Sequence, residues 1–284
     1  MNSTADKFAV NPVCPIYRTL CKLRHTWAMR PVRDELSVDN AESGVARPEH
    51  PVMLVFPHAG ATRLAYHRLG QELADQLTLR MMDLPGRPGR QDESLPTAMP
   101  DLLTAMTPLV DAAAVENCLL YGHSLGALLA FETARRLTAQ GRPPALLVVS
   151  GRNGPSQGSA YRAIRRLPDA EFLAAVAGMD STMQSLQDEP DLAKLFLPVL
   201  RADLTIAETY AYQPSETLLP CPILSFQGIE DPMVSRSGVW SWAVETTAGC
   251  AINWLPGQHF FHLTRPEFRA ALPGAIAAAL AGCP

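Results

Sequence analysis

The sequence lacks the features that mark several large classes of protein. It has no apolar run of about 18 residues, so no transmembrane helix is predicted. Met1 to Pro15 has no apolar core of the roughly 7–15 residues found in secretory signals. The 24 basic residues are outnumbered by 28 acidic ones, giving a net charge of −4, which excludes a broad basic surface for nucleic acid.

Cysteines are few and are not arranged as metal or disulfide motifs. None of the six forms a Cys-x-x-Cys pair or a spacing with histidine that is typical of metal sites. Cys118, Cys221 and Cys250 lie in or beside apolar runs, as small core residues of a reducing compartment do. We therefore predict a cytoplasmic protein with no bound metal and no membrane contact.

Short apolar runs that alternate with helix-like segments dominate the 284-residue chain, which is 47% hydrophobic. The runs predict strands over 52–56, 77–82, 118–121, 145–149, 222–227 and 251–255. Helices are predicted between them, over 64–76, 98–114, 127–137 and 238–247, with a last helix that is interrupted at Pro273. This alternation predicts an α/β fold with a mostly parallel central sheet and helices on both faces.

The domain boundaries follow from where this alternation begins and where it breaks. Residues 1–50 are irregular and proline-bearing, and we interpret them as an N-terminal extension and entry segment. Residues 51–284 then form the α/β domain. Within it, residues 154–212 contain helical patterns only, over 169–177 and 191–210, and an insertion at this place is typical of a lid.

The most informative motif is Gly122-His123-Ser124-Leu125-Gly126, a G-x-S-x-G sequence between a predicted strand and a predicted helix. A strand, a sharp glycine-flanked turn and a helix form the nucleophile elbow of α/β-hydrolases. The turn holds the serine hydroxyl clear of the backbone at the carboxyl end of the sheet. Ser124 is therefore the candidate nucleophile.

A serine needs a base to take its proton, and in α/β-hydrolases the acid and then the histidine follow it in the chain. Asp231, just after the strand at 222–227, is the candidate acid, and the adjacent Glu230 is its competitor. His259, after the last strand, is the candidate base, and His262 is its competitor.

Two backbone N–H groups are expected to form the oxyanion hole. One belongs to Leu125, which follows the nucleophile. The other is assigned to Ala59, in the loop Phe56-Pro57-His58-Ala59-Gly60 after the first strand. His58 in this loop is predicted to have a structural role.

Several separated segments together resemble the stand-alone type II thioesterases of polyketide and non-ribosomal peptide assembly lines. They are Phe-Pro-His-Ala-Gly at 56–60, Leu-Pro-Gly-Arg at 84–87, the elbow at 122–127 with Phe131-Glu132, Leu-Pro-Val-Leu-Arg-Ala-Asp at 197–203, and Gly257 with His259-Phe260-Phe261. The sequence departs from the family pattern at Ala61, where a second glycine is frequent, and in the continuation Pro88-Gly89-Arg90.

The resemblance implies hydrolysis of acyl thioesters on the phosphopantetheine arm of an acyl or peptidyl carrier protein, without a cofactor. The lid would then form the acyl pocket. Phe172, Val176, Phe196 and Leu200, at near-helical spacing, and Phe260 beside the candidate base are the candidate pocket residues, or else they simply pack on the core.

Two other functions remain open at this point. An esterase or lipase acting on small molecules would use the same three catalytic residues, because one fold hosts many chemistries. A catalytically silent scaffold that binds carriers would need none of them.

Overall fold

The computed structural model describes residues 50–158, 163–179 and 190–282. The predicted N-terminal extension therefore lies outside the described residues, apart from His50. The predicted lid is described except for residues 159–162 and 180–189.

The described strands form one sheet in which every neighbouring pair is parallel. The six strands are β1 (Val52–Phe56), β2 (Thr78–Met81), β3 (Leu119–His123), β4 (Leu146–Ser150), β5 (Ile223–Gly228) and β6 (Cys250–Leu255), in the spatial order β2-β1-β3-β4-β5-β6. Each predicted strand is present, with ends that differ by at most two residues. The predicted α/β fold with a parallel sheet is confirmed.

The central strands are buried on both faces, which explains why the sequence shows them as continuous apolar runs rather than alternating ones. Side chains of β1 still alternate between two cores. Leu54 and Phe56 belong to the core on one face of the sheet, and Met53 and Val55 to the core on the other.

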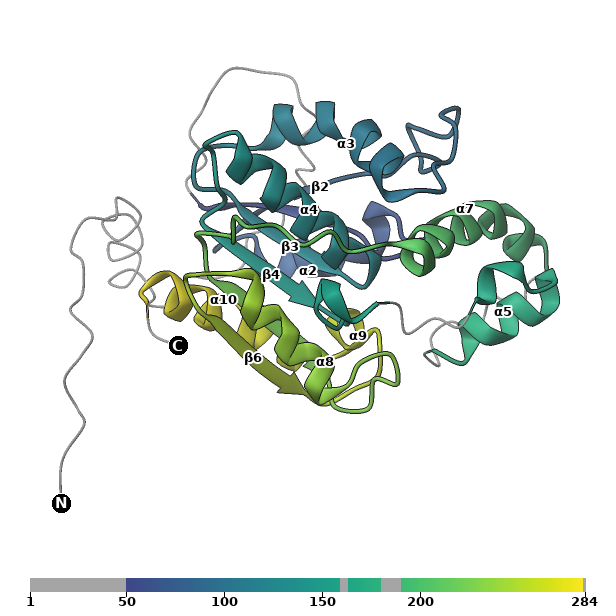
Figure 1. Ribbon diagram of the computed structural model, residues 1–284. Helices are drawn as coiled ribbons and strands as arrows, with labels where there is room; N and C mark the ends of the chain where they lie inside the picture. The colour runs from purple at the N-terminus through teal and green to yellow at the C-terminus, as the bar shows by residue number, and fades with distance from the viewer. Residues whose placement is uncertain (1–49, 159–162, 180–189, 283–284) are drawn as a thin grey trace. The chain divides into compact units, whose positions relative to one another are not determined.

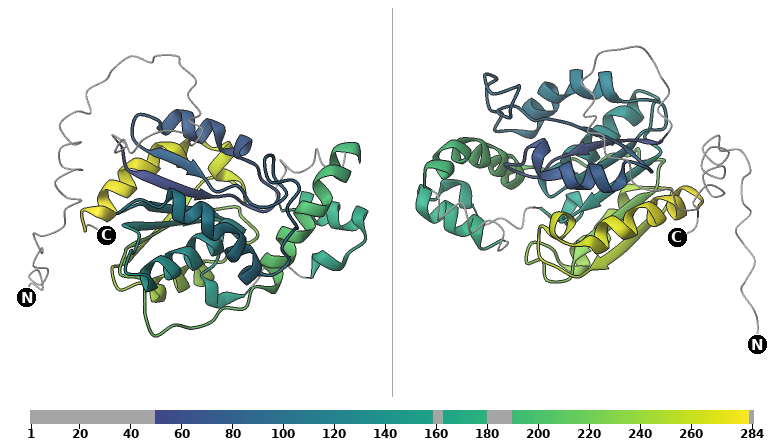
Figure 2. Two further views of the ribbon diagram at one scale, coloured as in Figure 1. Left: turned by 90° about the horizontal axis from the view of Figure 1, so that it is seen from above. Right: turned by 180° about the vertical axis from the view of Figure 1, so that it is seen from behind.

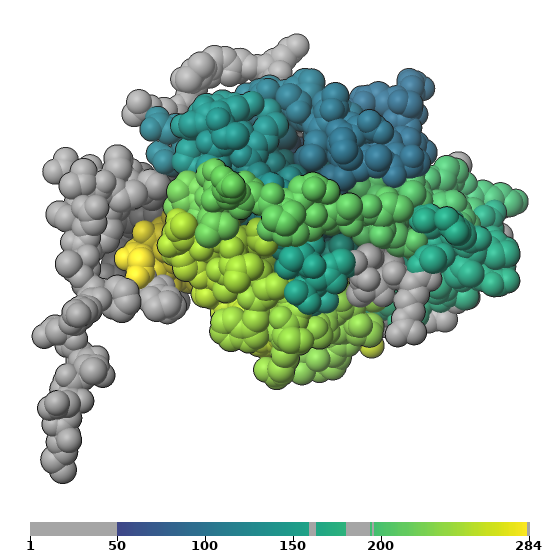
Figure 3. Space-filling view, viewed as in Figure 1, coloured from purple at the N-terminus to yellow at the C-terminus, as the bar shows by residue number. Residues whose placement is uncertain are grey.

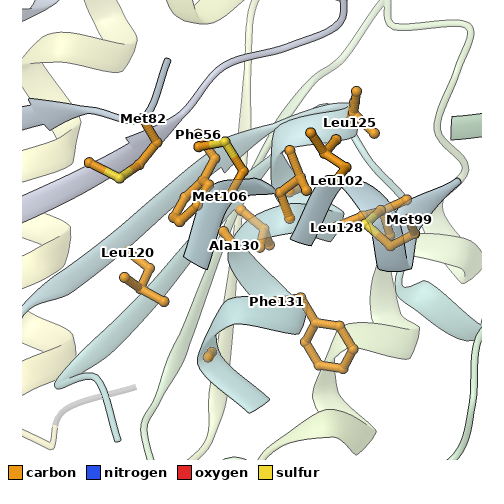
Figure 4. Packing of buried hydrophobic residues seen from close by; sticks show 14 of the residues in the cluster. Phe56, Met82, Met99, Leu102, Met106, Leu120, Leu125, Leu128, Ala130 and Phe131 are labelled. Atoms are coloured by element: carbon orange, nitrogen blue, oxygen red, sulfur yellow. The ribbon is translucent and has the colours of Figure 1, made fainter. Parts of the chain in front are cut away.

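Helices cover both faces of the sheet (Figure 1, Figure 2). On one face lie α3 (Met99–Ala113) and α4 (Leu125–Ala139), and on the other lie α2 (His67–Leu73) and α10 (Pro266–Leu280). Met99, Leu102 and Met106 of α3 pack beside Leu128 of α4 in the larger core (Figure 4). This packing holds the first turn of α4 rigidly at the end of β3.

Three helical predictions need correction. The helix predicted at 64–76 divides into a 3₁₀ turn, η1 (Arg63–Tyr66), and α2. The helix predicted at 238–247 divides into α8 (Arg236–Trp240) and η5 (Ser241–Glu245). The interruption predicted at Pro273 is wrong, because α9 (Phe261–Thr264) ends earlier and α10 continues through Pro273, at the loss of one backbone hydrogen bond.

The described residues of the insertion between β4 and β5 contain helices and no strand. It contains η2 (Pro155–Gln157), η3 (Ile164–Arg166), α5 (Asp169–Ala177) and α7 (Pro190–Thr209). Both α5 and α7 lie beyond the end of the sheet toward which the strand arrows point (Figure 1, Figure 2). In the space-filling view α7, in green, lies against the blue residues that follow β2 (Figure 3). Within the described residues, no helix is both long and apolar enough to cross a membrane.

Candidate active site

Ser124 sits between β3 and α4 with φ 56° and ψ −113°, a conformation that a non-glycine residue rarely adopts. The turn requires glycine on both sides. A Cβ at Gly122 would lie 2.0 Å from the Gly126 carbonyl oxygen, and a Cβ at Gly126 would lie 2.0 Å from that of Phe56. The structure therefore contains the predicted strand, tight turn and helix, and the two glycines are needed for close backbone approach rather than for positive φ.

Asp231 and His259, which are distant in sequence, are hydrogen-bonded to each other. His259 Nδ1 lies 2.8 Å from Asp231 Oδ2, and the other carboxylate oxygen accepts from the Met233 N–H at 2.8 Å. Both side chains are buried. Because a carboxylate only accepts hydrogen bonds, Nδ1 carries the proton and Nε2 of the neutral imidazole is the basic nitrogen.

The two competitors are placed differently. Glu230 is exposed, and its carboxylate accepts from the N–H of Gly257, in the loop that leads to His259. His262 belongs to α9 and stacks on His123, with ring centroids 3.7 Å apart. Glu230 therefore stabilises the loop that carries His259, and His262 packs against His123.

Ser124, His259 and Ala59 share one cavity, although they come from three separate segments. Its wall also contains His58, Phe260, Val176, Met179, Leu200 and Leu204. Three of the candidate pocket residues, Val176, Leu200 and Phe260, are therefore brought to the candidate nucleophile.

The other two candidate pocket residues are not among the residues that line this cavity. Phe172 is fully buried, and the guanidinium carbon of Arg201 lies 4.1 Å from its ring centroid. Phe196 is half-buried in the first half of α7. Met179 and Leu204 also line the cavity, although they were not among the candidate pocket residues. The spacing of four residues between Leu200 and Leu204 puts them on one helix face and was a usable signal for Leu204.

The two candidate oxyanion donors belong to different elements. Ala59 lies in the cavity wall. Leu125 is the first residue of α4, where backbone N–H groups have no intrahelical acceptor and the helix dipole favours negative charge. Ala61 is not among the residues with positive φ, so the alanine at this position causes no backbone strain.

Three further histidines are buried at or beside the site: His58, which lines the cavity, and His123 and His262. Burial is the main cause that lowers the pKa of His58 to about 3, and His259 and Arg87 lower it further. Burial also holds the pKa values of His123 and His262 well below the usual value. The cluster is therefore uncharged at neutral pH. The described residues contain no group of three or more side chains that could hold a metal ion.

These lowered pKa values predict a loss of stability in mild acid. Histidines of the unfolded chain bind a proton near pH 6.5, whereas these three in the folded protein do not. The free energy of unfolding therefore has its full value above about pH 6.5. The free energy of unfolding falls as the pH decreases toward the pKa values of the folded protein, and the pKa of His58 there is about 3. Each histidine contributes up to about 1.4 kcal/mol per pH unit to this fall. Urea unfolding at several pH values measures it.

The variant His262→Leu tests the effect of one of these histidines. It breaks no side-chain hydrogen bond, because neither ring nitrogen of His262 has a hydrogen-bond partner among the described residues. The free energy of unfolding of this variant should fall less steeply with decreasing pH than that of the wild type, and the two slopes should differ by up to about 1.4 kcal/mol per pH unit. His67→Leu, at an exposed position, should keep the wild-type slope. Equal slopes for the wild type and His262→Leu would contradict the assignment.

Comparison with known proteins identifies the family. Residues 51–274 match the family model described as a thioesterase domain. Thioesterase PikA5 of Streptomyces venezuelae is 32% identical over 78% of this chain and 82% of its own length. The solved type II thioesterase BorB from the borrelidin biosynthetic cluster is 32% identical, with a TM-score of 0.71 and coverage of 84% of this chain and 94% of its own. The RedJ thioesterase of the prodiginine pathway in Streptomyces coelicolor is 30% identical, with a TM-score of 0.73 and coverage of 98% and 99%.

Proposed function

The chain belongs to the thioesterase family, as a type II enzyme of polyketide and non-ribosomal peptide pathways, and from this premise we propose how and on what it acts. Its reaction is hydrolysis of acyl thioesters on the phosphopantetheine arm of acyl or peptidyl carrier proteins. This reaction clears misprimed or stalled carriers or releases a fatty acyl chain. The catalytic residues proposed are Ser124, His259 and Asp231.

In the first half of the reaction, Ser124 Oγ attacks the thioester carbonyl carbon while His259 Nε2 removes its proton. Asp231 holds the imidazole by Nδ1 and stabilises the cation that forms. The N–H groups of Ala59 and Leu125 donate to the oxyanion. The tetrahedral intermediate then collapses, and the carrier thiolate leaves with the proton held by His259.

The second half repeats these steps with water as the nucleophile. His259 removes a proton from the water, which attacks the acyl-Ser124 ester. Collapse of the second intermediate returns the proton to Ser124 Oγ and releases the free acid. No cofactor takes part in either half, because the acyl group is transferred only to serine and then to water.

The observation that carries this proposal is the convergence of Ser124, His259 and Ala59 on one cavity, with Asp231 hydrogen-bonded to His259. The apolar wall contributed by Val176, Met179, Leu200 and Leu204 of the insertion suits an acyl chain. The insertion is therefore proposed as a lid over the acyl group. A silent scaffold would have no need for this convergence.

The partner proposed is a carrier protein, and the location proposed is the cytoplasm. Free thiols at Cys118 and Cys221, both buried, suit a reducing compartment. Arg162, Arg165 and Arg166 form a basic cluster in the sequence of the insertion, and Arg162 lies outside the described residues. Arg165 pairs with the buried carboxylate of Glu208. Arg165 thus has a structural partner and is a poor candidate for docking an acidic carrier, while Arg166 is exposed.

A comparison of thioester and oxygen-ester substrates tests this function. One carrier protein is loaded in turn with acetyl, medium-chain and long-chain acyl groups, and its deacylation is followed by intact-mass spectrometry. The same acyl groups are offered as simple oxygen esters. We expect the carrier thioesters to be hydrolysed with the higher kcat/KM. Hydrolysis of the simple esters without loss from any carrier would move the protein to the esterase function.

A further inference from the structure

A buried ion pair joins two side chains, Arg87 and Asp203, that have no role in the proposed reaction steps. Arg87 lies in the loop that follows β2, and Asp203 lies in α7, 116 residues further along the chain. Arg87 Nη1 donates to Asp203 Oδ1 at 3.2 Å, and Nη2 donates to Oδ2. The two side chains are only 1% and 6% exposed, so both charges are removed from water.

The same two side chains hold the loop that carries Ala59. The N–H of Gly60 donates to Asp203 Oδ2 at 2.7 Å, and Arg87 Nε donates to the carbonyl oxygen of Ala61 at 3.1 Å. The N–H of Gly60 belongs to the peptide group that directly follows Ala59. Holding this group restrains the backbone on the C-terminal side of Ala59.

A leucine of α7 also packs directly against this loop. A Cβ at Gly60 would lie 2.9 Å from Leu200 Cδ1 of α7, closer than side-chain contacts normally come. Leu200 and Leu204, on either side of Asp203 in α7, line the cavity that contains Ser124. One turn of α7 thus forms part of the acyl pocket and also carries the carboxylate that binds the loop.

Stability alone gives a poor account of this pair. A buried ion pair contributes little compared with apolar side chains of the same volume, because both ions are desolvated. Burial raises the pKa of the Asp203 carboxyl, although Arg87 and the Gly60 N–H oppose the shift. What the pair provides, and an apolar pair cannot, is an acceptor for the Gly60 N–H and a donor for the Ala61 carbonyl.

We propose that Asp203 and Arg87 are positioning residues for the oxyanion hole. The Asp203 carboxylate on α7 holds the peptide after Ala59, and Arg87 holds that carboxylate, so that the Ala59 N–H stays directed at the acyl carbonyl. This proposal rests on the proposed function for the role of Ala59. It makes the oxyanion geometry depend on the position of α7 in the insertion.

The variant Asp203→Asn tests the role of the carboxylate. An oxyanion donor acts in the transition state, so kcat for deacylation should fall by about 10–100-fold while KM changes little. The rate at which a fluorophosphonate probe labels Ser124 should fall by a similar factor, because its phosphoryl oxygen occupies the same hole. The pH dependence of labelling should keep its midpoint, since His259 and Asp231 are untouched.

A double variant separates positioning from stability. Arg87→Met with Asp203→Leu replaces the ion pair by apolar side chains, and its melting temperature should be close to that of the wild type. Its kcat and its rate of labelling should nevertheless stay as low as those of Asp203→Asn. Glu208→Gln, which removes another buried carboxylate of α7 that pairs with Arg165, is the matched control and should keep wild-type kcat.

Three results would overturn the proposal: a folded Asp203→Asn protein with wild-type labelling, recovery of kcat in the double variant, or failure of both variants to fold, which would assign the pair to stability. The labelling readout needs no carrier. If the wild type deacylates no carrier, the proposed function fails, while the labelling rates still decide the role of the ion pair.

Discussion

Replacing Ser124 by alanine is expected to lower the rate of carrier deacylation by about 10³–10⁶-fold. The variant loses the atom that forms the acyl-enzyme, and His259 is left with no hydroxyl to deprotonate. Only direct attack by water, helped by the Ala59 and Leu125 N–H groups, would remain. Intact-mass spectrometry of an acyl-loaded carrier measures the residual rate.

The fold of this variant should be preserved. Alanine keeps the Cβ that the φ of 56° already accommodates, so no new strain is introduced at the turn. Circular dichroism and thermal unfolding should therefore match the wild type. Near-wild-type hydrolysis by a folded Ser124→Ala protein would refute the assignment of the nucleophile and, with it, the acyl-enzyme mechanism.

Replacing Gly126 by alanine is expected to have the largest effect on stability, a loss of more than about 4 kcal/mol or failure to fold. The added methyl would lie 2.0 Å from the carbonyl oxygen of Phe56, in the first strand of the sheet. Relief would require separation of α4 from β1, which would open the larger core where α4 packs. Urea unfolding measures the loss.

Gly274→Ala is the matched control for this prediction. Gly274 lies in α10, and nothing approaches within 4 Å of the position of an added Cβ. Alanine there should stabilise the helix by roughly 0.5–1 kcal/mol, because it restricts the unfolded chain. A Gly126→Ala protein as stable as the wild type would show that β1 and α4 do not approach each other this closely.

For the candidate catalytic residues, order and type could be predicted because each follows an apolar strand. Parallel strands bring their carboxyl ends to one edge of the sheet, and residues that follow these strands therefore meet there. Their spacing in sequence could not separate Asp231 from Glu230 or His259 from His262. The hydrogen bond of Asp231 to His259 distinguishes them, because it depends on the direction of each side chain.

The sequence by itself determined the fold class, the six strands and the elbow, because these depend on local patterns: apolar runs, glycines and strand–helix alternation. Only the tertiary structure decided which residues of the insertion reach the cavity and which, like Phe172, are not among the residues that line it. It alone also joined Arg87 and Asp203 to the loop of Gly60. The contacts of Asp203 join residues 143 and 116 positions apart. No local pattern encodes them, because they depend on how the insertion packs on the completed sheet.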